Sequence, residues 1–288
     1  MNMRPDAELI SRQVALALQE DLGSGDLTAG LIDAQAVSQV EVICREEAVL
    51  CGCDWFDEVF RLLSPEVSID WQAKDGDRLL PGQCICRMQG NTRSLLSGER
   101  AALNYLQTLS GTATLARRYA DAVAGTGARV LDTRKTIPGL RLQQKYAVSC
   151  GGCANHRIGL FDAILIKENH IHAAGSTSLA LQAALAAAPE GVEIEIEVES
   201  LEQLSEALDA GARRVLLDNF ELDGLRQAVA LNQGRARLEA SGNVNLQTIR
   251  TIAETGVDDI SVGALTKDVR AVDLSMRFVS SSSEAESI

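Results

Sequence analysis

The sequence predicts an α/β fold whose C-terminal half is a barrel of parallel strands. Strand-like and helical segments alternate from residue 128 onward. The last four strand candidates recur about every 20 to 23 residues, which is the length of one βα unit. Regular βα repetition gives a parallel sheet, either open and doubly wound or closed as a barrel. We favour the barrel because no Gly-x-Gly-x-x-Gly turn follows the first strand.

Composition restricts the class of protein. The 288 residues are 46% hydrophobic and 23% charged, which is ordinary for a globular protein, and only 3% are aromatic. The formal net charge of −13 argues against nucleic acid or an anionic membrane as a partner. We find no signal peptide, and no apolar run approaches the roughly 18 residues of a membrane span. With seven scattered cysteines, we expect a cytoplasmic protein with reduced thiols.

The first part of the chain predicts a mixed α/β domain. Its helices are expected at 5–20, where Asp6 is the cap, at 55–63, and over 98–123, which reads as one or two helices broken near Gly111. Its strands are expected at 37–50 and within 66–88, around turns at 75–77 and 81–83. We place the domain boundary after residue 112.

The second part supplies the barrel. Its strands are expected at 129–132, 163–167, 192–199, 213–218, 237–241 and 259–263, and helices at 201–211, 221–231 and 245–256 separate the later ones. The tail at 279–288 is of low complexity, and we expect it to be frayed.

Each expected barrel strand ends in polar residues suited to binding. Function in such barrels lies at the carboxyl ends of the strands. In chain order these ends carry Arg134 with Lys135, then Lys167, Glu197, Asp218, Ser241-Gly242-Asn243 and Ser261-Val262-Gly263. One polar strand end is unremarkable, since strands usually run out into solvent. Six in a row, sorted by charge, indicate a binding site.

The charges divide the predicted barrel mouth into two sides. Residues 129–167 hold seven Lys or Arg and two acids, whereas residues 193–209 hold seven acids and no base. Arginine and lysine bind carboxylate and phosphate, and carboxylates accept sugar hydroxyls or hold Mg²⁺. Ser241 and Gly242 are expected directly before a helix whose N-terminus favours phosphate. These features indicate a phosphorylated sugar beside a polyanionic small molecule.

Seven segments, in order along the chain, resemble quinolinate phosphoribosyltransferase. They are EDLGSGDLT (20–28), GERAALNYLQTLSG (98–111), DTRKTIPGLR (132–141), CANHRIGLFDAILIKENH (153–170), VLLDN (215–219), EASGNV (239–244) and SVGALT (261–266). The resemblance implies an incomplete, seven-stranded α/β barrel over 113–267 and a mixed α/β N-terminal domain over 1–112, rejoined by 268–288. It implies transfer of a phosphoribosyl group from phosphoribosyl pyrophosphate to quinolinate, then decarboxylation to nicotinate mononucleotide, a step of NAD biosynthesis. It also implies Mg²⁺ and a homodimer.

The resemblance assigns roles to residues that match the family's motifs. Those implied to bind the quinolinate carboxylates and neighbouring phosphate are Arg134, Lys135, His156, Arg157 and Lys167, with Arg100 reaching in from the partner subunit. Glu197 and Asp218 are implied to hold ribose hydroxyls and the metal, directly or through water. The 5′-phosphate is assigned to Ser241, Gly242, Asn243, Gly263 and Ala264, and Thr133 and Ser261 complete the substrate-binding set. The catalytic residues are Lys135, Lys167, Glu197 and Asp218, since a pyridine nitrogen carries no proton to remove and needs positioning and charge stabilisation instead.

Two positions depart from the family's pattern. Cys153 stands where a third glycine is expected, and Lys267 stands where many members have histidine. Cys153 is expected to crowd the loop that presents His156, and Lys267 to touch the phosphate end.

Other interpretations remain open at this level. Taken singly, the basic residues are also typical of solvated loops, and the acids at 193–199 of a strand facing solvent or helices. Cys150-Gly-Gly-Cys153 with His156 has the spacing of half a zinc site or a redox pair, although no second pair matches it. A sister enzyme acting on nicotinate would share the fold but need fewer positive charges. A non-catalytic relative would have lost charged positions that are present here.

Overall fold

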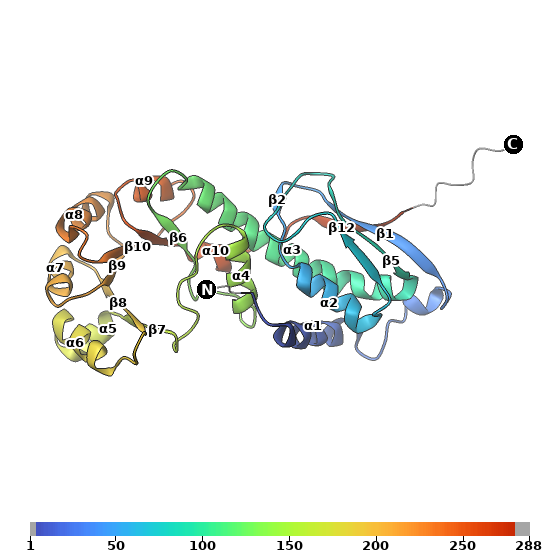
Figure 1. Ribbon diagram of the computed structural model, residues 1–288, viewed down its shortest axis with the longest axis horizontal. Helices are drawn as coiled ribbons and strands as arrows, with labels where there is room; N and C mark the ends of the chain where they lie inside the picture. The colour runs from blue at the N-terminus through green and yellow to red at the C-terminus, as the bar shows by residue number, and fades with distance from the viewer. Residues whose placement is uncertain (1–3, 280–288) are drawn as a thin grey trace. The chain divides into compact units, whose positions relative to one another are not determined.

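The computed structural model describes residues 4–279, which divide into two compact units (Figure 1). The first unit runs to Thr114 and resumes at Val269, and the second runs from Leu115 to Asp268, so the division falls within α3 (Thr92–Ala122). The segment 268–288 was expected to rejoin the first unit, and the tail at 279–288 to be frayed. Residues 280–288, which belong to both predictions, lie outside the described residues. No helix within 4–279 has the length and apolarity needed to cross a membrane.

The first unit is built on an antiparallel sheet in the order β12-β1-β5-β3. These strands are β1 (Val37–Cys44), β3 (Ser68–Trp71), β5 (Cys84–Asn91) and β12 (Leu274–Phe278). The other elements are α1 (Ala7–Leu22), η1 (Ala29–Leu31), α2 (Cys53–Leu63) and the pair β2 (Ala48–Val49) and β4 (Arg78–Leu79). Asp6 caps α1 as predicted, because its carboxylate accepts the Leu9 amide at 2.8 Å. Trp55, Phe56 and Phe60 of α2 are fully buried and form much of the core.

Two sequence predictions for this unit need correction. The strand expected at 37–50 is two strands, since β1 leaves the main sheet at Cys44 and β2 pairs with β4 instead. The break expected near Gly111 does not occur, and α3 is one continuous helix. A side chain at Gly111 would place its Cβ 2.2 Å from the Arg270 carbonyl oxygen, so this glycine admits a passing chain segment rather than ending the helix.

The second unit contains six parallel strands in the order β6-β11-β10-β9-β8-β7 (Figure 1). They are β6 (Arg129–Leu131), β7 (Ala163–Ile166), β8 (Glu193–Val198), β9 (Arg214–Asp218), β10 (Arg237–Ser241) and β11 (Asp259–Ser261), close to the predicted bounds. The helices are α4 (Arg141–Cys150), α5 (Glu168–Ala174), α6 (Thr177–Ala187), α7 (Leu201–Asp209), α8 (Leu222–Asn232), α9 (Ile249–Ala253) and α10 (Ala264–Lys267). The fold is an incomplete α/β barrel. In place of a seventh strand, the described residues have a single bridge from Leu131 to Ala154.

The barrel strands divide their residues between two faces. In β8, Ile196 and Val198 belong to the apolar core shared with the helices, whereas Glu195 and Glu197 alternate with them and lie on the other face. Both glutamates are buried. Glu195 and Glu197 therefore face the barrel interior rather than solvent or helices, whereas Glu193, the first residue of the strand, is exposed.

Candidate active site

The carboxyl ends of the parallel strands gather the predicted catalytic residues. Lys167 follows β7, and its Nζ lies 2.6 Å from the Oε2 of Glu197 at the end of β8. Asp218 ends β9 next to this pair, and burial raises the pKa of its carboxyl, as does the negative charge of Glu197. The positive charges of Lys167 and Lys135 act on the same carboxyl in the opposite direction. The four predicted catalytic residues are therefore electrostatic neighbours.

Lys135 lies against a loop that the sequence assigned to phosphate. A Cβ at Gly263 would lie 3.0 Å from the Cδ of Lys135, so the Lys135 side chain lies directly against this glycine and would have to shift slightly to admit a larger residue. The Lys135 backbone is held on both sides. Its carbonyl accepts the Thr266 hydroxyl at 2.9 Å, and its amide donates to the Thr133 hydroxyl at 3.1 Å.

Two arginines of this unit, Arg134 and Arg157, influence each other electrostatically. Burial lowers the pKa of Arg157, and the positive charge of Arg134 lowers it further. The Nε of Arg134 is buried and has no hydrogen-bond partner within the described residues. A buried charged donor without a partner is costly, and a bound anion satisfies it. This part of the site is therefore built for a carboxylate or phosphate.

The glycine loop after β10 needs its glycine for two reasons. Gly242 has φ of +107°, and a Cβ there would lie 2.1 Å from the Oδ1 of Asn219. Asn219 and Asn243 also have positive φ, and the Asn219 amide donates to the Ser241 carbonyl at 2.9 Å. The loops after β9 and β10 thus fit closely against each other.

The helix expected directly after this loop begins later than predicted. It is α9, whose first residue is Ile249, so residues 243–248 separate it from Gly242. The Asn245 side chain accepts the amides of Gln247 and Thr248 at 2.9 and 3.0 Å, which makes a turn in place of a first helical turn. The helix dipole therefore does not act at Gly242. Of the other predicted phosphate residues, Ser261 ends β11 and is buried, and Ala264 opens α10.

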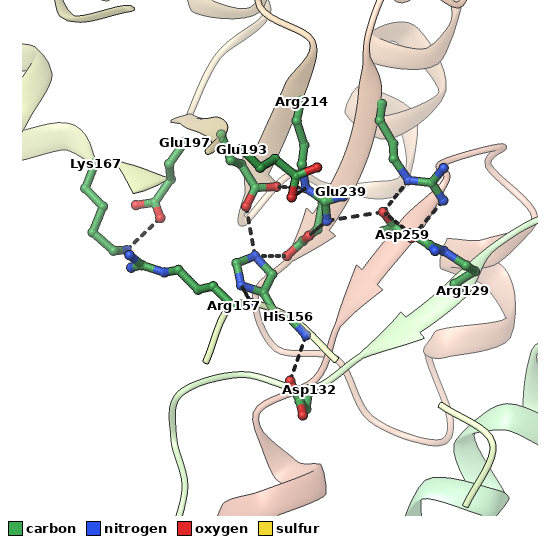
Figure 2. Close-up of polar contacts among 12 residues, drawn as sticks. Arg129, Asp132, His156, Arg157, Lys167, Glu193, Glu197, Arg214, Glu239 and Asp259 are labelled. Atoms are coloured by element: carbon green, nitrogen blue, oxygen red, sulfur yellow. Dashed lines mark hydrogen bonds and ion pairs between the residues drawn. The ribbon is translucent and has the colours of Figure 1, made fainter. Parts of the chain in front are cut away.

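His156 lies at the centre of a buried charge network that the sequence did not reveal. Its Nε2 is 2.8 Å from the Oε2 of Glu195 and 3.6 Å from the Oε1 of Glu239 (Figure 2). Arg214 bridges the two glutamates, at 3.0 Å from Glu195 and 2.7 Å from Glu239. Burial raises the pKa of Glu239 to about 7, with a further contribution from the charge of Glu195. The one available signal was the strict alternation of Glu and Ile in β8, which places acids on a single face.

A second unpredicted group anchors the loop that carries His156. The carboxylate of Asp132 accepts the His156 amide at 2.8 Å and the Asn155 side chain at 2.7 Å. Lys145 pairs with the same carboxylate at 2.5 Å, and its Nζ also donates to the His156 carbonyl at 3.0 Å. Both charged side chains are fully buried. The backbone of this loop is therefore fixed by an ion pair in the barrel wall.

The barrel mouth has fewer acids on its anionic side than the sequence predicted. Of the seven acids at 193–209, Glu202, Glu206 and Asp209 belong to α7 outside the sheet. Glu197 instead contacts Lys167 from the neighbouring strand. Arg100 lies on α3 in the first unit, where its side chain is 59% exposed and its guanidinium lies 4.0 Å from Glu99, so it is not among the residues that the second unit brings together.

The two departures from the family pattern contact residues other than the predicted catalytic ones. The Cys153 thiol is buried and donates to the Ala116 carbonyl at 3.1 Å, so it points into the core under α3 and does not crowd the His156 loop. This also removes the zinc interpretation, since Cys153 and His156 face different surroundings. None of the seven cysteines, all within 4–279, forms a disulfide. Lys267 pairs with the adjacent Asp268 at 2.8 Å.

Comparisons with known proteins agree with this geometry. Residues 26–110 and 112–277 match the models of the N-terminal and C-terminal domains of quinolinate phosphoribosyl transferase. A probable nicotinate-nucleotide pyrophosphorylase [carboxylating] of Bacillus subtilis is 41% identical over 93% of this chain and 92% of its own length. A quinolinate phosphoribosyltransferase [decarboxylating] of Nicotiana tabacum is 38% identical over 91% of this chain and 80% of its own.

Solved structures agree in fold as well as sequence. The nicotinate-nucleotide pyrophosphorylase of Francisella tularensis superposes with a TM-score of 0.93 at 43% identity, covering 96% of this chain and 98% of its own. Both halves of the chain match the same family in order, and the similarity extends over nearly the whole length. The chain belongs to the quinolinate phosphoribosyl transferase family.

Proposed function

We propose that this protein transfers a phosphoribosyl group from phosphoribosyl pyrophosphate to quinolinate and decarboxylates the adduct to nicotinate mononucleotide, a step of NAD biosynthesis. The observation that carries the proposal, beyond family membership, is the buried Arg134 Nε without a partner beside the Arg157 guanidinium. A bound anion would satisfy the buried donor of Arg134 and would also be attracted by the positive charge of Arg157. Quinolinate, with two adjacent carboxylates, supplies it.

The first step forms a bond between the pyridine nitrogen and C1 of the ribose while the bond from C1 to the pyrophosphate oxygen breaks. The nitrogen lone pair makes the new bond, so no base is required. The residues of this chain contribute positioning and charge. Arg134, Arg157 and Lys135 hold the dicarboxylate. Glu197 and Asp218 accept hydrogen bonds from the ribose hydroxyls and stabilise the positive charge that develops on the sugar. Gly242 and Gly263 let backbone amides approach the 5′-phosphate.

The second step releases the carboxylate next to the ring nitrogen as CO₂. The electron pair of the broken bond stays on that ring carbon, where the positively charged nitrogen stabilises it, and the carbon then takes up a proton. Lys135 and Lys167 both act electrostatically on Asp218, and Lys167 is held by Glu197 at 2.6 Å. We assign these two lysines to orienting the carboxylates in both steps.

Glu197 and Asp218 fit a Mg²⁺ ion. Magnesium is typically held by one or two carboxylates, with water and substrate phosphates completing its shell. The pKa of Asp218 is raised by burial and by Glu197, and a cation would relieve that repulsion. Bound there, Mg²⁺ supplies positive charge for the departing pyrophosphate. Asp218→Asn should raise the Mg²⁺ concentration needed for half-maximal turnover, and chelation should abolish turnover.

We also propose a homodimer in which Arg100 completes the neighbour's site. The support is that the Arg100 side chain is 59% exposed, with Glu99 at the outer limit of an ion pair. Arg100→Ala and Lys135→Ala proteins should each be inactive. Mixing them should restore activity, because one site of a mixed dimer is intact, whereas no recovery would place Arg100 elsewhere. Seven cysteines without a disulfide support a reducing compartment, the cytoplasm.

The deciding experiment follows CO₂ and nicotinate mononucleotide together, with quinolinate, phosphoribosyl pyrophosphate and Mg²⁺, and with nicotinate as a parallel substrate. Equal amounts of CO₂ and nicotinate mononucleotide, formed with quinolinate but not with nicotinate, would support the proposal. Turnover of nicotinate alone would keep the phosphate site but change the substrate. Lys135→Ala should lower kcat by about 100-fold or more, and near-normal turnover would remove this lysine from the mechanism.

A further inference from the structure

We propose that Glu195 and Glu239, with Arg214 between them, are positioning residues that fix the His156 ring and, through it, the backbone of Arg157. This inference rests on the proposed function, because Arg157 is assigned there to quinolinate. The three charged residues lie in the barrel interior and touch neither the Lys167–Glu197 pair nor the glycine loops in any contact found among the described residues.

Both nitrogens of the His156 ring are occupied by the protein. The Arg157 amide donates to Nδ1 at 2.8 Å, so Nδ1 carries no proton. The proton of the neutral ring is then on Nε2, which donates to Glu195 at 2.8 Å. The adjacent carboxylates favour the charged imidazolium and raise the pKa of His156, although burial opposes them. Protonation of Nδ1 would remove the hydrogen bond that it accepts from the Arg157 amide, so this contact assigns the neutral ring with its proton on Nε2.

The two glutamates differ in what they contribute. Glu195 makes the direct hydrogen bond, whereas the Oε1 of Glu239 lies 3.6 Å from Nε2, is fully buried and has no hydrogen-bond partner among the described residues. It can accept the same proton if the ring tilts. Arg214 holds both carboxylates in place and offsets their mutual repulsion. The ring is thereby confined to a small range of orientations.

The arrangement changes what His156 does. Since neither nitrogen is free, the ring acts as a fixed wall and as the acceptor that sets the Arg157 amide. The glutamates orient the imidazole, and the imidazole orients the backbone of Arg157, whose guanidinium is assigned to quinolinate. Loosening the ring should therefore weaken quinolinate binding. A change at Glu195 should leave phosphoribosyl pyrophosphate binding unaffected, because Glu195 lies on β8, whereas the glycine loops follow β10 and β11.

A matched pair of variants on one strand tests this. Glu195→Gln keeps the side chain's shape but removes the charge that Arg214 and His156 share. Glu193→Gln changes the same residue type two positions earlier, where the side chain is 64% exposed and its one ion pair within residues 4–279 is with Arg214, at 3.8 Å. We expect the KM for quinolinate to rise about tenfold or more in Glu195→Gln, with the KM for phosphoribosyl pyrophosphate unchanged. Glu193→Gln should match the wild type in both. Glu239→Gln is the second variant, and it should shift the quinolinate KM in the same direction.

A spectroscopic measurement on the unmodified protein decides the ring's state independently of activity. With only three histidines in the chain, ¹⁵N-histidine labelling gives a simple spectrum, and a His156→Asn sample identifies the signal. We expect Nε2 protonated and Nδ1 unprotonated at about pH 8. A protonated Nδ1, or equal KM values in folded Glu195→Gln and wild type, would overturn the inference. Absence of quinolinate turnover by the wild type would instead reject the proposed function, while the spectrum would still decide the ring's state.

Discussion

The buried pair of Lys145 and Asp132 should be among the most sensitive positions in the second unit. In Lys145→Met the Asp132 carboxylate stays fully buried without the cation that lies 2.5 Å away. Two unit charges at that distance attract by about 7 kcal/mol at an effective dielectric constant of about 20. Desolvation offsets part of this, since burial lowers the pKa of Lys145 and raises that of Asp132 despite their pairing. Removing one partner should lower the free energy of unfolding by about 3–5 kcal/mol.

The assay is urea unfolding followed by far-UV circular dichroism, which reports helices and strands of both units. Tryptophan fluorescence is less suitable, because Trp55 and Trp71 are the only tryptophans and both lie in the first unit. The matched control is Arg226→Met. Its ion pair with Asp223 has a similar length, 2.6 Å, but both side chains are more than half exposed. That change should cost no more than about 1 kcal/mol.

The double variant Asp132→Asn/Lys145→Met tests whether the loss of stability comes from the unpaired buried charge. Removing both charges leaves no buried ion without a partner, so much of the loss should be recovered. If Lys145→Met is no less stable than Arg226→Met, burial does not set the value of this pair. If the double variant is less stable than Lys145→Met, the loss came from packing and the electrostatic explanation fails.

Three other changes have defined outcomes. Gly242→Ala should raise the KM for phosphoribosyl pyrophosphate and lower the free energy of unfolding by about 1–3 kcal/mol, because Gly242 has φ of +107° and lies against Asn219. The control is Gly234→Ala, where φ is +76° and nothing lies within 4 Å, so that only backbone strain is introduced. Equal effects of the two changes on this KM would contradict a phosphate role for Gly242. Asp259 binds three arginines, and the hydrogen bonds from Arg237 and Arg129 lower its pKa below 3.8 despite burial. Its contribution to stability is therefore present above pH 3.8 and is lost as the pH falls through the lowered pKa. In urea unfolding, Asp259→Asn should differ from the wild type most at neutral pH, and the two should converge in acid. Cys153→Gly should cost about 2 kcal/mol in urea unfolding with both KM values unchanged, and a changed quinolinate KM would mean that the thiol does influence the His156 loop.

The sequence by itself determined the barrel strands and their ends. Parallel strands buried on both faces leave a strong apolar pattern, and their period of one βα unit is a local property. The polar residues directly after the strands had to meet at one edge whatever the details of packing, which is why Lys135, Lys167, Glu197 and Asp218 were predicted together. Their roles came from the motif resemblance, since spacing does not distinguish a binding lysine from a solvated one.

Only the tertiary structure decided what lies beneath that edge. Glu195, Arg214 and Glu239 come from three strands, and each reads in sequence as an exposed charge because isolated ions are rarely buried. They are buried only because they neutralise one another, and that pairing depends on strand order and register. The same holds for Gly111, where the chain segment at Arg270 that needs its space is far away in sequence. Long-range pairing and close backbone approach leave no local pattern, and these are the features that position His156 and its loop.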